Sequence, residues 1–308
     1  MNNPYNVLFI YFNNLERTRA VFEQIRKARP AVLFLYQDGA RAGKGEEKKV
    51  LEVREFVENN IDWECIVHKK YQPTNVGCDP SEYLAQTWAF SIVDKCIVLE
   101  DDDVPNLSFF RFCWELLLKY EHDSRIGIIC GMNNLTTYGP NNADYFFTRS
   151  GSIWGWATWK RVIDNWDKDY SWLDDERSLK IVEEWYKNKK AYQNFVRLAE
   201  RRRESKIEYY ETILGVSLIL NHQLNIVPCK NMISNIGVNG GVHTSGSFKA
   251  MLKKRQRLFF KETYELDGQL RHPTEVAEDA RYKMLVDRDL RLNFAEKCIC
   301  KIKKAIYR

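Results

Sequence analysis

The first part of the chain alternates short apolar runs with longer amphipathic segments. Apolar runs of strand length lie at 6–12, 31–36, 63–69, 96–99 and 126–130. Segments with apolar residues at helical spacing lie between them, at 15–28, 46–60, 81–93 and 109–120. Such alternation is typical of βαβ units, whose strands form a mostly parallel sheet with helices on both faces. The sequence therefore predicts an α/β fold over about the first 130 residues.

The composition indicates a globular chain without a membrane span. Of its 308 residues, 44% are hydrophobic, which is enough to bury one large core. No apolar run approaches the roughly 18 to 20 residues that span a bilayer, and the opening residues do not form a signal peptide. The eight cysteines include no CxxC pair, so we expect no zinc site. These features predict a cytoplasmic protein.

The net charge of +5 is unevenly distributed. Residues 249–308 hold 16 Lys and Arg against 9 Asp and Glu, a balance of +7, so the remainder carries −2. A basic balance is compatible with nucleic acid, but no helix-turn-helix, zinc-finger or RNP-type motif accompanies it. We therefore expect no nucleic-acid partner.

An acidic cluster follows the fourth apolar run. Residues 95–110 read KCIVLEDDDVPNLSFF, which places Glu100, Asp101, Asp102 and Asp103 directly after a buried strand. Ligands of open α/β sheets bind at the carboxyl ends of strands, and like charges this close favour a cation among them. A solvated acidic turn is the alternative interpretation.

The usual phosphate-binding loops are missing from the sequence. There is no GxGxxG after the first apolar run and no GxxxxGK[ST] motif anywhere in the chain. Backbone amides arranged as in those loops are therefore not available to hold a diphosphate. A Mg²⁺ or Mn²⁺ ion bound by the acidic cluster would neutralise the charge of the diphosphate instead.

Three blocks of the sequence resemble a known family. They are the acidic cluster followed by proline and paired phenylalanines, SGSIWGWATWKR at 150–161, and NIVPCKNMISNIGVNGGVHTSG at 225–246. The first is similar to the metal-binding segment of GT-A fold glycosyltransferases, in particular the animal N-acetylglucosaminyltransferase that begins complex N-glycan assembly. The other two are similar to its bacterial relatives, the HlpA-like proteins. The resemblance implies a GT-A (Rossmann-like) fold with a nucleotide-sugar donor.

The resemblance implies roles for residues of the donor half. Asp102 takes the place of the direct metal ligand, while Glu100 and Asp101 face the ribose and bound waters. Asp38 would meet the uracil ring, with a turn aspartate as the alternative. Residues 11–13, including Tyr11 and Asn13, would flank the same base. Asp103 departs from the animal enzyme, which has an apolar residue there.

The tryptophans of 150–161 are candidates for the sugar site. Aromatic rings hold the apolar faces of sugars, but Trp154, Trp156 and Trp159 could equally pack in the core. We expect a split, with at least one buried and at least one lining the site. Trp154 and Trp156 are the donor-binding candidates.

By resemblance, Glu211 is the catalytic base of an inverting transfer. It would take the proton from the acceptor hydroxyl, and its place at the start of a helix over 211–221 would keep it ionised. The relatives have Asp between tryptophans here, whereas this chain has Glu without them. A helix-capping role is the alternative, with Glu208 as the fallback base.

Two features of the C-terminal part remain open. The resemblance to GT-A enzymes implies that His243 would reach the metal or the diphosphate, although a loop histidine is often just exposed. The last segment carries an apolar stripe at Ala295, Ile299, Ile302 and Ile306 among basic residues. It would bind an anionic membrane surface or pack on the domain.

These observations together predict a GT-A domain over 1–248, with a nucleotide-binding half at 1–130 and an acceptor and catalytic half at 131–248. A basic helical extension follows at 249–308. The expected function is metal-dependent, inverting transfer from a UDP-linked sugar such as UDP-GlcNAc. The acceptor would be a saccharide or lipid-linked saccharide of surface polysaccharide synthesis, at the inner face of the plasma membrane.

Other classes of protein stay open at this point. A sugar-1-phosphate nucleotidyltransferase would also use acidic metal ligands, but it usually has a glycine-rich loop with Arg and Lys where this chain has residues 13–17. A metal phosphohydrolase would need more histidines among the acids. A noncatalytic carbohydrate-binding protein would not need Asp102 and Glu211 in one cleft.

Overall fold

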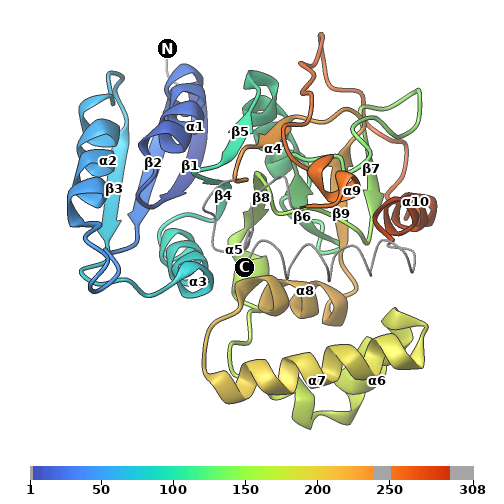
Figure 1. Ribbon diagram of the computed structural model, residues 1–308. Coiled ribbons are helices and arrows are strands. Elements are labelled where there is room, and N and C mark those ends of the chain that lie inside the picture. Colours follow the sequence, from blue (N-terminus) through green and yellow to red (C-terminus); the bar gives the residue numbers. More distant parts are fainter. Residues whose placement is uncertain (1–2, 239–250, 292–308) are drawn as a thin grey trace.

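A large mixed β-sheet forms the centre of the protein in the computed structural model, which describes residues 3–238 and 251–291 (Figure 1). The strand order is β3-β2-β1-β4-β8-β6-β9-β7. The strands are β1 (Asn3–Tyr11), β2 (Pro30–Gln37), β3 (Ile66–Tyr71), β4 (Lys95–Glu100), β6 (Ile126–Cys130), β7 (Tyr145–Thr148), β8 (Trp156–Trp159) and β9 (Leu224–Pro228). The α/β fold predicted from the alternating pattern is confirmed.

The first half of the sheet is parallel and matches the prediction closely. β1 pairs in parallel with β2 and β4, and β2 pairs in parallel with β3. The four predicted helices are present as α1 (Leu15–Ala28), α2 (Glu47–Asn59), α3 (Cys78–Phe90) and α4 (Leu107–Lys119). α1 contacts α2 and α4, whereas α3 contacts α8 (Tyr210–Leu220), so helices cover both faces.

The strand order reverses between β1 and β4. From β1 the chain proceeds outward to β2 and β3, and it then returns through α3 to place β4 on the other side of β1. The carboxyl ends of the two strands, at Tyr11 and Glu100, therefore lie side by side. Crevices at such reversal points are where open α/β sheets bind ligands.

Strand β8 is antiparallel to both of its neighbours, which the sequence analysis did not predict. Trp156 pairs with Val98 of β4 and with Cys130 of β6. All four residues of β8 are buried, so the strand shows no apolar–polar alternation. Four buried residues that follow a glycine carry no strand periodicity, so the sequence alone does not reveal this strand.

A second, two-stranded sheet joins two distant motifs. β5 (Asp103–Pro105) pairs antiparallel with β10 (Ile233–Asn235), so that Asp103 lies opposite Asn235. The last acid of the cluster is therefore fixed beside the SNIG sequence at 234–237.

A helical lobe lies below the sheet in the view of Figure 1. It contains α6 (Glu176–Tyr186) and α7 (Lys189–Ser205), with the short elements α5 (Lys160–Ile163) and η1 (Ser171–Asp174) leading to it. Tyr170, Trp172, Val182 and Ile213 share the lobe's own apolar cluster. Because Ile213 belongs to α8, that helix joins the lobe to the main domain.

Residues 251–291 pack against the domain rather than standing apart from it. Their helices are α9 (Lys253–Gln256) and α10 (Ala280–Leu290), and Leu270, Tyr282 and Val286 belong to the main core. The Asn106 side chain donates to the Tyr264 carbonyl at 2.7 Å. The boundary at 248 stays a prediction. Among the residues described, no helix is both long and apolar enough to cross a membrane.

Candidate functional site

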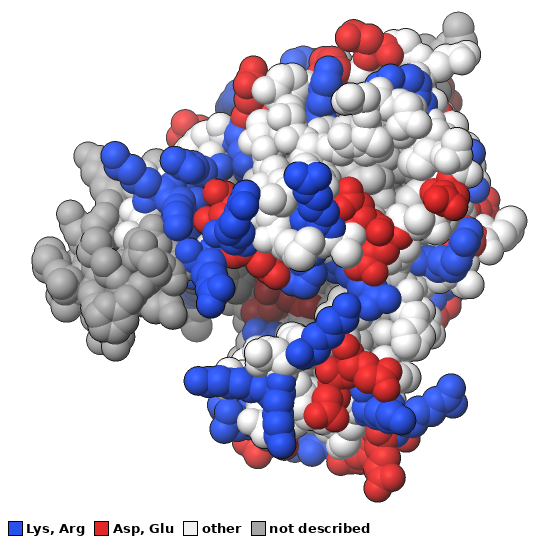
Figure 2. All heavy atoms as spheres, turned by 90° about the vertical axis from the view of Figure 1, so that its right-hand side faces the viewer, with Lys and Arg blue, Asp and Glu red and all other residues white. Residues whose placement is uncertain are grey.

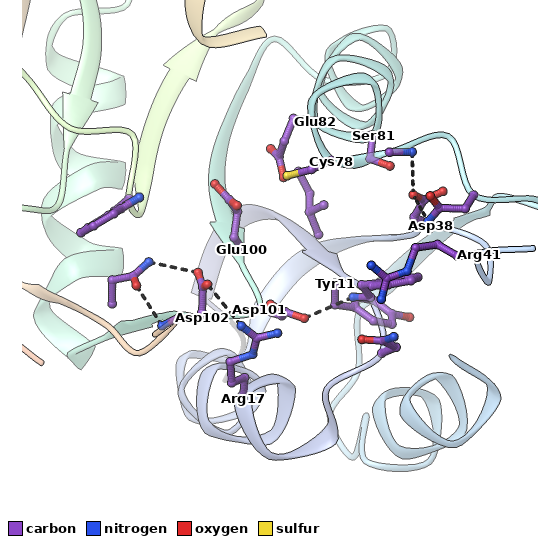
Figure 3. A pocket seen from close by; sticks show the side chains of 18 of the residues that line it. Tyr11, Arg17, Asp38, Arg41, Cys78, Ser81, Glu82, Glu100, Asp101 and Asp102 are labelled. Atoms are coloured by element: carbon purple, nitrogen blue, oxygen red, sulfur yellow. Dashed lines mark hydrogen bonds and ion pairs between the residues drawn. The ribbon is translucent and has the colours of Figure 1, made fainter. Parts of the chain in front are cut away.

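A cavity of about 320 Å³ opens where β1 and β4 end (Figure 3). Its walls come from the carboxyl ends of β1, β2 and β4, the first turns of α3, and the segments around Trp154 and Asn235. Six predicted site residues line it together: Tyr11, Asn13, Asp38, Glu100, Asp101 and Asp102. Trp154 lines it as well. The structure thus brings these residues together in one cavity at the carboxyl ends of the strands, and their roles stay predictions.

One end of the cavity is bordered by aromatic and guanidinium groups. Tyr11 is buried at the end of β1, and the Arg41 guanidinium lies over the neighbouring Phe12 ring, 5.5 Å from its centroid. Glu46 holds this end together, because it pairs with Arg41 and accepts from the Asn13 side chain at 3.0 Å. The Arg41 partner lowers the pKa of Glu46 to about 2. The aromatic and guanidinium groups thus stay in fixed positions.

Asp38 fixes the loop that borders the same end. Its carboxylate accepts from the backbone N–H groups of Val76 at 2.9 Å and Gly77 at 3.1 Å, and from the Asn75 side chain at 2.7 Å. Burial nevertheless raises its pKa. Asp38 is thus more than an exposed turn residue, and its contact with uracil stays a prediction.

The opposite end of the cavity is acidic. Glu100, Asp101 and Asp102 line it, and the Asp101 carboxylate accepts from the Phe12 backbone N–H at 3.3 Å. Burial raises the pKa of Asp101 to about 7, and repulsion by Asp102 adds to the shift. Burial and the Glu82 carboxylate raise the pKa of Glu100 well above its usual range. Positive charge at this end would relieve that repulsion.

Asp102 is clamped by the SNIG segment. Its Oδ1 accepts from the Asn235 side chain at 3.0 Å, and its backbone carbonyl accepts from the Ile236 N–H at 2.8 Å. A Cβ added to Gly237 would lie 1.9 Å from Asp102 Oδ2, so only glycine allows this approach. The Arg17 guanidinium lies 3.8 Å from the same oxygen. Asp102 is therefore held in one position.

Asp103 has a different role from its neighbours. It is fully buried and does not line the cavity. Its carboxylate accepts from the Gly155 N–H and from the Asn235 side chain, both at 2.9 Å. This acid thus joins β5 to β10 and to the turn before β8, which explains a residue for which the resemblance offered no role.

The acidic residues supply a suitable donor set for a hard cation. Mg²⁺ and Mn²⁺ prefer oxygen ligands, often one or two carboxylates plus substrate phosphates, and Asp102 with Glu100 and Asp101 offers such oxygens. Within residues 3–238 and 251–291, no group of three or more His, Cys, Asp or Glu side chains is arranged to hold a metal by itself. His243 lies outside the described residues.

The tryptophans divide between site and core, as expected. Trp154 lines the cavity, and its ring packs on Phe259 with centroids 5.1 Å apart. Trp156 and Trp159 are buried in β8, and the Trp159 indole donates to the Leu117 carbonyl at 2.9 Å. The structure does not bring Trp156 to the cavity, because its side chain points into the sheet core. Its predicted contact with the donor is therefore wrong.

Glu211 lies beside this cavity rather than in it. It stands in the first turn of α8 and lines a neighbouring cavity with Arg149 and Trp185. The residue before it, Tyr210, reaches the first cavity, where its hydroxyl donates to Glu100 at 3.4 Å. Glu211 opens a helix as predicted. Its role as base stays a prediction, as does that of the half-buried Glu208.

Sequence reasoning missed three charged residues of the cavity, Arg17, Arg41 and Glu82. Glu82 is buried on α3, accepts from Gln86 at 3.1 Å, and points toward Glu100 in Figure 3. Burial raises its pKa to about 8. The sequence does indicate a special role for Glu82, because Glu82 and Gln86 interrupt an otherwise small and apolar stripe of the helix. Arg17 gave no signal, because one arginine in a charged helix is ordinary.

Comparisons with known proteins place the chain near no named family. No family model and no curated protein matches the sequence. Among solved structures, an apo UDP-glucose pyrophosphorylase is 9% identical with a TM-score of 0.38, covering 74% of this chain and 93% of its own. A UDP-glucose pyrophosphorylase complexed with UDP-glucose is 10% identical with a TM-score of 0.31, covering 52% and 78%. Both are nucleotidyltransferase-type proteins, the alternative class left open by the sequence, but at these TM-scores neither likeness carries an argument.

Proposed function

We propose that this protein is a metal-dependent, inverting glycosyltransferase that uses a UDP-linked sugar such as UDP-GlcNAc. The observation that carries the proposal is the division of one cavity into two chemical halves. Tyr11, Arg41 and the loop fixed by Asp38 form one half, and the clamped Asp102 with its acidic neighbours forms the other. A nucleoside fits the first half, and a cation-bound diphosphate fits the second.

Each group of the cavity has a task in this transfer. Asp102, with Glu100 and Asp101 beside it, would hold a Mn²⁺ or Mg²⁺ ion that supplies positive charge against the departing diphosphate. Arg17 adds a fixed positive charge at the same place. Trp154 offers an aromatic face to the sugar ring, and the Phe259 ring packs against the Trp154 indole.

Glu211 is the proposed base. The oxygen of an acceptor hydroxyl attacks the anomeric carbon, the bond from that carbon to the diphosphate oxygen breaks, and its electron pair leaves with the diphosphate. The hydroxyl proton passes to the Glu211 carboxylate. One displacement inverts the anomeric configuration. The acceptor is a saccharide or lipid-linked saccharide of surface polysaccharide synthesis, reached from the inner face of the plasma membrane.

Sugar-1-phosphate nucleotidyl transfer is the second candidate. The observation in its favour is Arg17, a guanidinium at the start of the first helix that lines the cavity next to the acidic cluster. A nucleotidyltransferase usually has Arg and Lys in the loop after its first strand. The chain still has no glycine-rich loop at 13–17.

Product analysis separates the two reactions. Purified protein is incubated with UDP-GlcNAc, UDP-glucose or UDP-galactose and Mn²⁺, with and without pyrophosphate, and nucleotides are resolved by ion-exchange chromatography. Glycosyl transfer, or its slow counterpart with water as acceptor, releases UDP without pyrophosphate. Release of UTP and sugar 1-phosphate only with pyrophosphate would establish the second candidate and overturn the first.

A further inference from the structure

A second cavity, of about 440 Å³, lies next to the donor cavity. It is bounded by α8, by β6 and β9 of the sheet, and by the segment 149–153, with Trp185 of α6 beside them. On the face drawn in Figure 2, the surface is hollowed between the main body and the lobe that carries α6 and α7. The donor site described above does not use this second cavity.

Two buried amide oxygens in the second cavity have no partner. Gln223 is 4% exposed and Asn225 is 5% exposed, and neither Gln223 Oε1 nor Asn225 Oδ1 accepts a hydrogen bond from any described residue. Gln223 is oriented by its own amide nitrogen, which donates to the Ser124 carbonyl at 3.1 Å. Buried polar atoms are nearly always paired, and leaving one unpaired is costly. Both residues line the cavity, so its wall holds two acceptors whose hydrogen-bonding capacity is unused.

The remaining polar groups define what that ligand is. Arg149 brings no free charge, because it pairs with Glu278 at 3.0 Å and lies over the Trp185 ring, 4.8 Å from the ring centroid. Glu211 adds a carboxylate to the lining. The unpaired oxygens and the Glu211 carboxylate are acceptors, whereas Arg149 Nε, which also has no hydrogen-bond partner among the described residues, is a donor, and sugar hydroxyls can both donate and accept. A neutral ligand with several hydroxyl donors and an apolar face suits this lining.

Two chain segments connect the cavities. At the start of α8, Tyr210 reaches Glu100 in the donor cavity, while Glu211 faces the second cavity. Along 152–154, Ser152 lines the second cavity and Trp154 lines the first. A ligand in the second cavity thus lies beside the proposed base, in a cavity lined by Ser152, two residues before the proposed sugar-binding Trp154.

We propose that the second cavity binds the acceptor saccharide as a neutral sugar unit. Its hydroxyls would donate to Gln223 and Asn225, and its apolar face would lie near Trp185. This inference rests on the proposed glycosyl transfer and adds the place and the chemistry of the acceptor. The attacking hydroxyl is the one nearest Glu211, which takes its proton as the glycosidic bond forms.

Gly215 offers a way to fill the second cavity alone. It lies on α8 and lines this cavity, and no atom lies within 4 Å of an added Cβ. Methionine favours helices and would extend into the free space. We expect Gly215→Met to keep the donor affinity measured by calorimetry, while transfer to sugar acceptors falls by at least roughly tenfold. Glu204→Met, which places the same side chain on the exposed face of α7, should change neither donor affinity nor transfer.

Direct binding gives an independent measurement should Gly215→Met fail to fold. Saturation-transfer NMR with the methyl glycosides of glucose, galactose, mannose and N-acetylglucosamine should show at least one binding to the wild-type protein. Trp185→Ala should weaken that binding roughly tenfold, the scale expected for loss of an aromatic contact, while donor hydrolysis continues.

The outcomes distinguish this inference from the proposed function. If the wild-type protein never cleaves a nucleotide sugar, glycosyl transfer itself is wrong. If it does so and Gly215→Met still transfers to sugars at the wild-type rate, the acceptor binds elsewhere. Absence of glycoside binding to a wild-type protein that hydrolyses donor would also overturn the assignment.

Discussion

The side-chain amide of Asn235 donates to Asp102 Oδ1 at 3.0 Å, although the two residues are 133 positions apart. The same amide nitrogen donates to Asp103 at 2.9 Å. Its two amide protons are thereby both used, so Asn235 holds the proposed metal ligand in place. Loss of a group that orients a metal ligand commonly lowers metal affinity by about 10- to 100-fold.

Loss of the Asn235 amide should weaken the metal site. Asn235→Ala frees the Asp102 carboxylate and removes one partner of the buried Asp103, so we expect Mn²⁺ affinity to fall by about 10- to 100-fold. Stability should fall by about 1–3 kcal/mol. Mn²⁺ titration by electron paramagnetic resonance and urea unfolding measure the two effects. Asn194→Ala, at an exposed position of α7, is the control. Equal Mn²⁺ affinity in the two variants would refute the positioning role of Asn235.

Removal of the Asp102 carboxylate should abolish transfer. Asp102→Ala deletes the main proposed ligand, so donor binding should weaken and turnover should disappear, while the half-buried position leaves the fold intact. Turnover is followed by UDP release and folding by circular dichroism. Asp287→Ala, on the exposed surface of α10, is the matched control. Normal turnover by Asp102→Ala in the presence of a chelator would refute the assignment.

Replacement of the proposed base should slow the chemical step. Glu211→Gln keeps the shape and removes the proton acceptor, so the rate of transfer should fall by roughly 10² to 10⁴ with donor affinity unchanged. Rates are measured at saturating donor, and donor affinity by calorimetry. Glu208→Gln is the comparison, and a wild-type rate for Glu211→Gln with a slow Glu208→Gln would transfer the role to Glu208.

The buried carboxyl of Glu82 should make the metal-free protein less stable as pH rises. Its pKa is raised from 4.5 to about 8, so between these values the folded state binds the proton more tightly than the unfolded state. The contribution of Glu82 to the free energy of unfolding is therefore fully present below about pH 4.5. It is lost as pH rises toward 8, at up to about 1.4 kcal/mol per pH unit. Glu82→Gln cannot ionise and should flatten this slope.

Thermal unfolding in the presence of chelator, at several pH values from 5 to 8, measures the slope. The same slope in Glu82→Gln and in the wild-type protein would show that another group is responsible. Glu184→Gln, an exposed glutamate of α6, controls for the loss of one acidic side chain.

The C-terminal segment should bind anionic membranes independently of catalysis. Removing residues 295–308 deletes the apolar stripe and five basic residues, each worth about 1 kcal/mol at an anionic surface. Cosedimentation with phosphatidylserine vesicles should fall sharply, while donor hydrolysis persists. If the truncated protein unfolds, the segment packs on the domain. If the full-length chain never binds vesicles, the acceptor is soluble.

Local sequence patterns were sufficient to predict the parallel half of the sheet. Its strands and helices have clear apolar periodicities, and the chain visits them in order, so β1 to β4 and α1 to α4 lie close to their predicted bounds. Pattern failed at β8, because the strand is buried on both faces and has been inserted between two strands that precede it in sequence. Neither the burial of both faces nor the position of the strand in the sheet can be seen in a short stretch of sequence.

Site residues that directly follow a strand could be predicted from the sequence. Residues whose role depends on contacts with distant segments could not. Tyr11, Asp38 and Asp102 lie at strand ends, and the fold brings all three to one cavity. Trp154 and Trp156 could not be told apart, because their difference depends on where β8 begins. The roles of Glu82 and Asp103 depend on partners in distant segments, which no local pattern records.

Gly237 constrains how this protein can vary. Since a Cβ at this position would lie 1.9 Å from Asp102 Oδ2, any side chain at 237 displaces the carboxylate that the surrounding segment holds in place. Exchange of Gly237 for any other residue therefore requires a different position of the Asp102 side chain. Because the same Cβ would also lie 3.2 Å from Asn235 Oδ1, shortening residue 102 alone would not make position 237 open to every side chain.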